Sequence, residues 1–380
     1  MVSLKERTVK GRTYIYLSTT ASYKGHKKWF EKMIGPKGMK KARMKRRIEF
    51  HTEILKAKKD VYEFILKVKH TELKHIPQGY GFYLTLISQY YEQYLSSMYP
   101  SELDKYIQEF EVRYVSSTTA LEGNTLSLRE TGLVLTEGLS PRNKKLREIH
   151  EVENYEKVLL CVKSRKKDID RGFILELHQL IQRNIDDDSA GSFRRGNVKI
   201  IGSKWEPPQG VVVEDEIKIL LDWYNVNKKT LHPVELAGLF HHKFLQVHPF
   251  ADGNGRVGRE LLNFIFKRNN YPMLIIPVEQ RQEYLESLEE ADNGKPGHLL
   301  EFFIKILIKD YFTVVFNTFQ MFQAKIGADL GELDKSEIEE IKNFLIWFIE
   351  ETKELLINQK KIEPDLKDLL GQLIKPEDSS

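Results

Sequence analysis

Hydrophobic side chains recur at three- and four-residue steps along most of the chain, which is the spacing of amphipathic helices. The pattern predicts helices over 51–72, 84–113, 144–164, 171–185, 213–226, 232–247, 255–268, 278–290 and 297–324. A last helix is expected to begin near Asp334 or Ser336, with its apolar residues in one stripe. The sequence therefore predicts a mainly α fold.

Two segments depart from the helical pattern. Arg12–Leu17 alternates β-branched and aromatic residues, Tyr23–His26 is a turn candidate, and 28–34 fits a second strand. These features predict a small N-terminal hairpin, after which a basic run over 40–47 enters a helix. Residues 191–210 do not fit a helix, and 191–202 predicts a short extended piece that Pro207 and Pro208 close.

Charge is distributed unevenly along the chain. Residues 1–47 hold fifteen Lys and Arg against two acids, a balance of +13, so the other 333 residues sum to −9 within the overall +4. A basic arm on an acidic body indicates an anionic partner for the arm. A solvated, charged segment without a partner is the alternative interpretation.

Composition indicates a cytoplasmic, globular chain. A single cysteine, Cys161, cannot form an internal disulfide, which favours a reducing compartment. The N-terminus has no apolar core of a signal peptide. The most apolar window, 299–316, is interrupted by Lys305, Lys309 and Asp310, so a buried helix is expected there and no membrane span.

The densest polar, glycine-rich stretch is 248–259, HPFADGNGRVGR, between two helical patterns. A loop that ends in a helix N-terminus binds anions, because the first helical N–H groups have no internal partner. Gly253 and Gly255 have no Cβ and allow the backbone to approach a phosphate closely.

Five polar residues of this stretch add reactive groups. Arg256 and Arg259 lie three apart on one helix face, and both can bind phosphate oxygens bidentately. Asp252 offers an oxygen ligand for Mg²⁺, and Asn254 can position a phosphate or cap the helix. The imidazole of His248 is suited to accept a proton near neutral pH. The set indicates phosphoryl or nucleotidyl transfer.

The stretch resembles, position for position, the signature of the Fic (filamentation induced by cAMP) family. The resemblance implies transfer of AMP from ATP to Ser, Thr or Tyr of a target protein. It implies His248 as the general base, Asp252 as the Mg²⁺ ligand and Phe250 as the anchor of the loop. It also implies an anion cradle and two phosphate-binding arginines, formed by Gly253, Asn254, Gly255, Arg256 and Arg259.

Residues 118–124, TTALEGN, are similar to the family's inhibitory pattern. The resemblance implies that Glu122, with Thr118 and Gly123, covers the site and that Glu122 pairs with Arg259. A common helix-start pattern has the same spacing, which is the alternative interpretation. The same glutamate could instead position a water that removes AMP from a modified target.

Two further matches are weaker in pattern. Val198, Lys199, Ile200 and Ile201 resemble the family's β-hairpin flap, which aligns the target peptide by strand addition. An ordinary surface hairpin is the alternative. Arg281 with Tyr284 resembles a family pair beside the nucleotide, and a packed helix explains it equally well.

The resemblance implies an orthogonal helical core with the loop between two helices. The expected organisation is a basic segment (1–47), a helical region (48–110), a Fic domain (111–312) and a helical tail (313–380). Expected partners are a protein target, the chain itself as target, and a second copy in a homodimer. A nucleotide-sensing regulator that binds nucleic acid through 1–47 is the competing function. A kinase-like transfer is disfavoured, because relatives with that activity lose the glycine at position 255.

Overall fold

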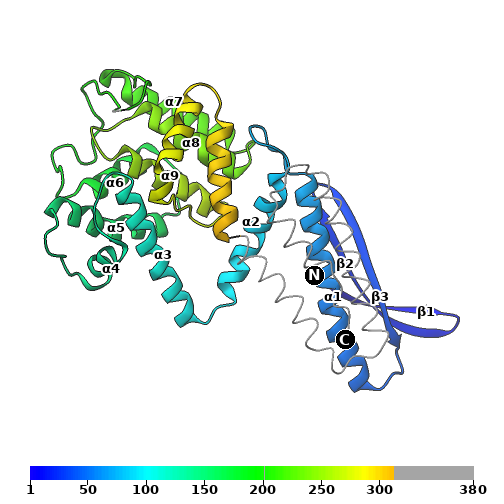
Figure 1. Ribbon diagram of the computed structural model, residues 1–380. Coiled ribbons are helices and arrows are strands. Elements are labelled where there is room, and N and C mark those ends of the chain that lie inside the picture. The colour runs from blue at the N-terminus through cyan, green and yellow to red at the C-terminus, as the bar shows by residue number, and fades with distance from the viewer. Residues whose placement is uncertain (201, 312–380) are drawn as a thin grey trace, which may run out of the picture. The chain divides into compact units, whose positions relative to one another are not determined.

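A computed structural model describes residues 1–200 and 202–311 (Figure 1). Ile201 and the predicted tail over 313–380, including the helix expected near Asp334, lie outside the described residues. Most described residues are helical, which confirms the mainly α fold. They divide into two compact units, one of 1–71 with 78–86 and one of 72–77 with 87 onward.

The first unit pairs a three-stranded antiparallel sheet with one long helix. The strands β1 (Ser3–Val9), β2 (Arg12–Tyr23) and β3 (His26–Pro36) lie in the order β1-β2-β3, and α1 (Lys41–Lys69) follows. The predicted hairpin is β2–β3, and β1 is an additional strand. The sequence does not reveal β1 because the strand is exposed along its whole length and needs no apolar face.

Both hairpins of this sheet turn through a Lys-Gly pair. The φ angles are 49° at Lys10 and 77° at Gly11, and 44° at Lys24 and 85° at Gly25. Two successive positive φ angles are the mark of type I′ turns, whose twist matches that of the strands. The second pair confirms the turn predicted at Tyr23–His26.

The sheet packs on α1 through a small apolar cluster. Ile15 and Leu17 of β2 meet Ile34 of β3 and Leu55 of α1, and each of the four is at most 6% exposed. Since α1 begins at Lys41 and is part of this packing, the domain boundary predicted at residue 47 falls inside a helix.

The second unit is helical. Its helices are α2 (Tyr80–Ser96), α3 (Pro100–Ala120), α4 (Leu128–Glu137), α5 (Leu146–Ser164), α6 (Arg171–Gln182), α7 (Val213–Asn227), α8 (Pro233–Val247), α9 (Asn254–Arg268) and α10 (Arg281–Asp292), and 297–311 is also helical. The division between the units falls within α2. No described helix is long and apolar enough to cross a bilayer.

Two predictions of helix boundaries were wrong. The single pattern over 84–113 is two helices, because Pro100 begins α3 and restricts the residue before it. The short helix α4 was not predicted. It begins with a capping box in which Ser127 accepts from the Glu130 N–H while the Glu130 carboxylate accepts from Ser127.

The core of the second unit lies along α8 and α9. Gly258 allows their close approach, since a Cβ there would lie 3.1 Å from Nδ1 of His241. Except at Gly255, no residue of α9 from Asn254 to Phe266 is appreciably exposed, so packing surrounds the helix. A rigid, buried α9 fixes the position of its N-terminus.

The segment predicted as a flap hairpin has no strand in its described residues. Between 191 and 209 the backbone is irregular, with one turn in which the Ser203 N–H donates to the Ile200 carbonyl (3.2 Å) and Gly202 has φ 81°. The described residues thus provide a turn without the strand pairing that was expected.

Candidate active site

The loop between α8 and α9 is held by an aromatic stack and a buried arginine. Phe250 is fully buried and stacks on His178 with ring centroids 3.7 Å apart. Arg194 donates from Nε to the His248 carbonyl (2.7 Å) and from Nη2 to the Pro208 carbonyl (2.6 Å). These contacts fix the loop backbone and tie it to the end of the 191–209 segment.

His248 ends α8 in the left-handed conformation, with φ 48°. This turn directs the chain into the loop, and Nδ1 of the imidazole is buried. Burial lowers the pKa of His248, and the positive charge of Arg194 acts in the same direction. The imidazole is therefore mainly neutral at pH 7 and able to accept a proton.

The side chain of Asn254 shapes the loop. Its Oδ1 accepts from the Phe250 N–H (2.9 Å) and its Nδ2 donates to the Phe250 carbonyl (2.8 Å), and the residue is only 3% exposed. This arrangement differs from the predicted use of the side chain for phosphate or as a helix cap, since Gly253 is the cap residue. Only the backbone amide of Asn254 remains available to an anion.

The first turn of α9 presents backbone amides. The N–H groups of Asn254, Gly255 and Arg256 stand where a helix provides no internal acceptor. Gly253 precedes them with φ 79°, and a Cβ there would lie 2.9 Å from Nε2 of the buried Gln182. Glycine is therefore required at 253 both by conformation and by space.

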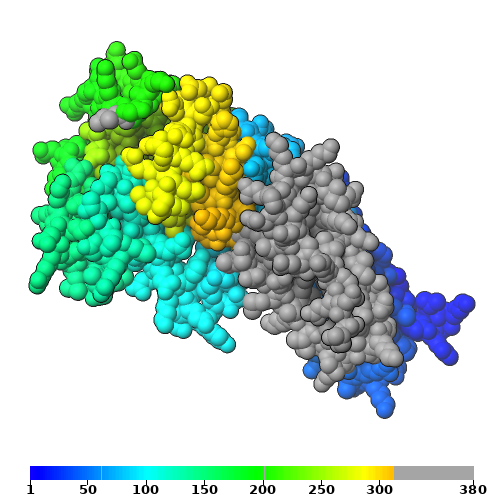
Figure 2. Space-filling model, in the orientation of Figure 1, coloured from blue at the N-terminus to red at the C-terminus, as the bar shows by residue number. Residues whose placement is uncertain are grey.

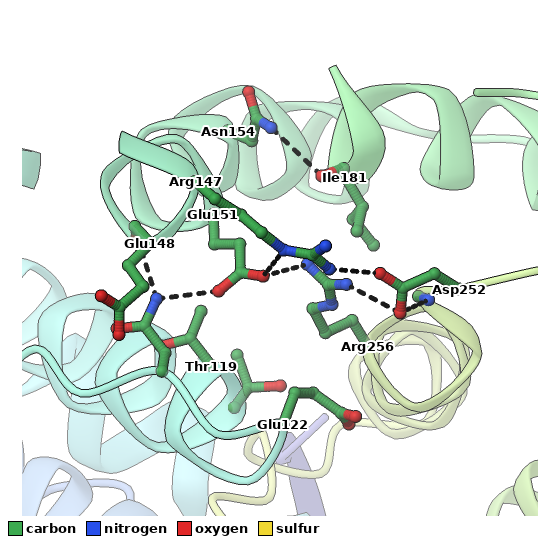
Figure 3. Close-up of polar contacts among 12 residues, drawn as sticks. Thr119, Glu122, Arg147, Glu148, Glu151, Asn154, Ile181, Asp252 and Arg256 are labelled. Carbon is green, nitrogen blue, oxygen red and sulfur yellow. Dashed lines mark hydrogen bonds and ion pairs between the residues drawn. The ribbon is translucent and has the colours of Figure 1, made fainter. Parts of the chain in front are cut away.

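Arg256 is buried, at 1% exposure, and only loosely paired. Its Nη1 lies 3.5 Å from Glu151 and its Nη2 lies 3.4 Å from Asp252. Among the described residues, the nitrogens Nε and Nη1 have no hydrogen-bond partner. Figure 3 shows the guanidinium between the two carboxylates. A buried cation with unused donors is a strong site for an anion such as phosphate.

Asp252 is held by its surroundings as a carboxylate. It accepts from Arg147 Nη2 (2.5 Å) and from the Gly253 N–H (2.6 Å) (Figure 3). Burial acts to raise the pKa of Asp252, but Arg256, the Gly253 amide and Arg147 outweigh it and lower the pKa. The carboxylate is thus ionised, 44% exposed, and occupied by an arginine from α5.

The guanidinium of Arg259 is hydrogen-bonded to residues at the C-terminal end of α3 and just after it. It donates from Nε to Thr118 Oγ1 (2.8 Å) and from Nη2 to the Thr118 carbonyl (2.9 Å) and Glu122 Oε1 (2.7 Å). Burial acts to lower the pKa of Arg259, but the charge of Glu122 raises it. The structure therefore contains the ion pair expected between Glu122 and Arg259.

Glu122 lies directly on the amide turn of α9. A Cβ added at Gly255 would collide with Glu122 Oε1, so the carboxylate covers the backbone that would hold a phosphate. Glu122 follows the last turn of α3, where Gly123 has φ 99°, so the helix-start interpretation of this motif was wrong. Arg281 supports the turn by donating to the Leu121 carbonyl (2.9 Å).

Several residues of this site were not predicted from the sequence. Arg147 and Glu151 lie four apart on α5, and their Nε–Oε1 distance of 3.3 Å is an ordinary helix pair by pattern. His178 accepts from the Gly191 N–H at Nδ1 (3.0 Å), so its Nε2 donates to the Asp252 carbonyl (3.1 Å). No local signal marks these positions, because their partners are distant in the sequence.

Comparisons with known proteins agree with this geometry. Residues 168–266 match the model of the Fic/DOC family. Over these residues the chain is similar to the Fic/DOC family. A crystallised Fic-domain-containing signaling protein from Bacteroides thetaiotaomicron superposes with a TM-score of 0.56 and 27% identity, over 61% of this chain and 97% of that one.

Relatives named as adenylyltransferases are similar to about half of this chain. Protein adenylyltransferase fic-1 of Caenorhabditis elegans is 37% identical over 198 residues, which are 50% of this chain and 39% of the relative. A structure of Fic-1 from the same organism superposes with a TM-score of 0.54 and 28% identity, over 72% of this chain and 85% of that one. The match thus spans well under half the length of the curated relative.

Proposed function

We propose that this chain is a protein adenylyltransferase that transfers AMP from ATP to a Ser, Thr or Tyr hydroxyl of a protein. The observation that carries the proposal is the buried, under-bonded Arg256 beside the free amides of α9 and the neutral His248. Adenylyltransferases among the relatives support the choice of AMP as the transferred group.

In the proposed reaction the hydroxyl oxygen of the target attacks the α-phosphorus of ATP. The bond from that phosphorus to the oxygen shared with the β-phosphate breaks, and pyrophosphate leaves. His248 accepts the proton of the hydroxyl, since its lowered pKa keeps the imidazole neutral. Arg256 and the α9 amides stabilise the negative charge that grows on the leaving phosphates.

Asp252 fits the role of a Mg²⁺ ligand. Its carboxylate is ionised and partly exposed, and Mg²⁺ in nucleotide sites is usually held by one or two carboxylates together with substrate phosphates. A Mg²⁺ ion bound there would neutralise phosphate charge. Arg147 occupies Oδ2 of the same carboxylate, so ligation through this oxygen requires Arg147 to move away.

The described conformation supports self-inhibition by Glu122. The carboxylate occupies Arg259 and lies on Gly255, the two places that would receive the terminal phosphates of ATP. ATP with its γ-phosphate near Arg259 would meet a negative charge and a filled space. Transfer would then require Glu122 to leave.

The test is label transfer from α-³²P-ATP with Mg²⁺ to protein, comparing wild type, Glu122→Gly and Glu122→Gly/His248→Ala. We expect strong labelling with Glu122→Gly, weak labelling with wild type and none with the double variant. Glu137→Gly, an exposed change at the end of α4, is the matched control and should label like wild type.

Other outcomes would redirect the proposal. Labelling by the double variant would remove His248 from the reaction. Labelling only from γ-³²P-ATP would make the chain a phosphate transferase. Wild type that removes AMP from the protein labelled by Glu122→Gly, with Glu122→Gly unable to do so, would assign Glu122 to de-AMPylation.

A further inference from the structure

Positive charge is concentrated in the first unit of the molecule. Residues 1–71 contain twenty Lys and Arg and six Asp and Glu, a balance of +14, so the rest of the chain carries −10 of the overall +4. The Fic domain lies in the acidic part. The basic unit is therefore not explained by ATP binding, and its charge indicates a separate polyanionic partner.

A protruding ribbon carries part of this charge, with Lys5, Arg7, Lys10 and Arg12 against one acid, Glu6. Strands β1 and β2 pair from Ser3↔Ser18 to Val9↔Arg12, and every residue of β1 is exposed. Figure 1 shows this ribbon extending beyond α1, and in Figure 2 its end projects from the surface (dark blue). Beyond Tyr14, where the pairing of β2 with β3 ends, β1 and β2 continue alone to the turn. A two-stranded antiparallel ribbon is one of the two elements that the major groove of B-form DNA admits.

The tip of the ribbon carries unpaired cations. Lys10 and Arg12 flank Gly11 in the turn, all three are exposed, and nothing lies within 4 Å of the space beside Gly11. Within the described part of the chain, no carboxylate pairs with Lys10 or Arg12. Their charges are available to phosphates on either side of a groove.

One face of the ribbon adds flat side chains. Lys5 lies 5.4 Å from the centre of the Trp29 ring, and the guanidinium of Arg7 lies 5.1 Å from that of Tyr16 and 5.6 Å from that of Trp29. Trp29 is 52% exposed. Arg7 also pairs with Glu31 (2.7 Å), so among the described residues Lys5, Lys10 and Arg12 are the cations of the ribbon that have no carboxylate partner.

We infer that the β1–β2 ribbon binds double-stranded DNA, with its tip in the major groove and Lys10 and Arg12 on the phosphates. Duplex RNA fits less well, because the major groove of A-form helices is deep and too narrow for this element. The binding rests mainly on charge and is expected to depend steeply on salt.

The experiment measures anisotropy of a fluorescent 25-base-pair duplex with the full-length protein at several salt concentrations. Lys10→Ala/Arg12→Ala removes two phosphate contacts, so the slope of log affinity against log salt should become shallower by about 1.8. We expect affinity at 0.1 M salt to fall by about tenfold or more. Lys157→Ala/Lys218→Ala, exposed changes on α5 and α7, is the matched control and should leave both values unchanged.

Three results would overturn the inference. They are no binding by wild type at 50 mM salt, equal loss in the control variant, and tighter binding of duplex RNA or single strands than of duplex DNA. Label transfer by the Glu122→Gly protein is measured in parallel with and without the ribbon changes. Because the two sites use different residues, failure of DNA binding would leave the adenylyltransferase proposal intact, and the reverse also holds.

Discussion

Arg256 and Arg259 lie one turn apart on α9, yet their guanidinium groups differ in how completely they are hydrogen-bonded. Arg259 makes three hydrogen bonds of 2.7–2.9 Å to the end of α3. Arg256 has carboxylates only at 3.4 and 3.5 Å, and two of its nitrogens are unused. The chain therefore satisfies the hydrogen-bond donors of Arg259 itself and leaves donors of Arg256 unused.

The difference comes from how many cations share each acid. Glu122 is bonded to Arg259 alone among the described cations. Glu151 is shared by Arg256, Arg147 and the amide of Asn124, and Asp252 is shared by Arg256 and Arg147. Sharing weakens each contact with Arg256, so a phosphate can compete for it. In the proposed reaction, Glu122 would inhibit at Arg259, and the phosphates of ATP would first bind at Arg256.

The largest effect is expected on the Arg256 side. In the Glu122→Gly background, Arg256→Lys should lower kcat/KM for AMP transfer by about 100-fold, because an ammonium cannot bind two phosphate oxygens in the same geometry. Arg268→Lys, at the other end of α9, is the matched control. Activity within twofold of the parent would show that transfer does not need the guanidinium of Arg256.

On the Arg259 side, Thr118→Val removes the hydroxyl that accepts from Nε. Hydrogen bonds to charged groups contribute about 1.5–3 kcal/mol, so the hold on Arg259 weakens and AMP transfer should rise by about tenfold in an otherwise wild-type chain. Thr119→Val is the control, since that hydroxyl bonds to its own helix at the Val115 carbonyl. A fall in activity would mean that Thr118 orients Arg259 for the reaction instead.

A variant of Arg147 tests whether its ion pair with Asp252 competes with Mg²⁺. In the Glu122→Gly background, Arg147→Ala should lower the Mg²⁺ concentration for half-maximal transfer by about threefold, because a partly exposed ion pair contributes less than about 1 kcal/mol. Lys157→Ala on the same helix should have no effect. A higher Mg²⁺ requirement would instead make Arg147 a support for Asp252.

The smallest expected effect is the pH dependence of the transfer rate, which His248 sets. Burial lowers the pKa of His248 below the usual 6.5, so the base form increases as pH rises and is the main form at pH 7. The rate of transfer by Glu122→Gly should rise with pH below 6.5 and change by no more than about 1.3-fold between pH 7 and 8. Continuous pH–rate data in one buffer system would check this, and a tenfold rise above pH 7 would contradict it.

The sequence by itself predicted most of the helices and the polar loop over 248–259, and the family resemblance implied the pairing partner of Arg259. Helical periodicity identified α5 to α10 to within a few residues, because each of these helices has an apolar side to bury. The loop over 248–259 could be predicted because its glycines, its acid and its arginines lie within twelve consecutive residues. Glu122 and Arg259 are far apart in the chain, and their pairing was predicted because each lies in a motif that resembles a motif of the Fic family.

Only the tertiary structure decided the environment of those residues. That Asn254 bonds to Phe250, that Arg147 occupies Asp252 and that Arg194 holds His248 all depend on contacts between distant segments. The strand β1 was also hidden, since an exposed strand carries no hydrophobic alternation. A local sequence pattern shows which side of a segment is buried. The partners of a charged side chain depend on which distant segments the fold brings next to it.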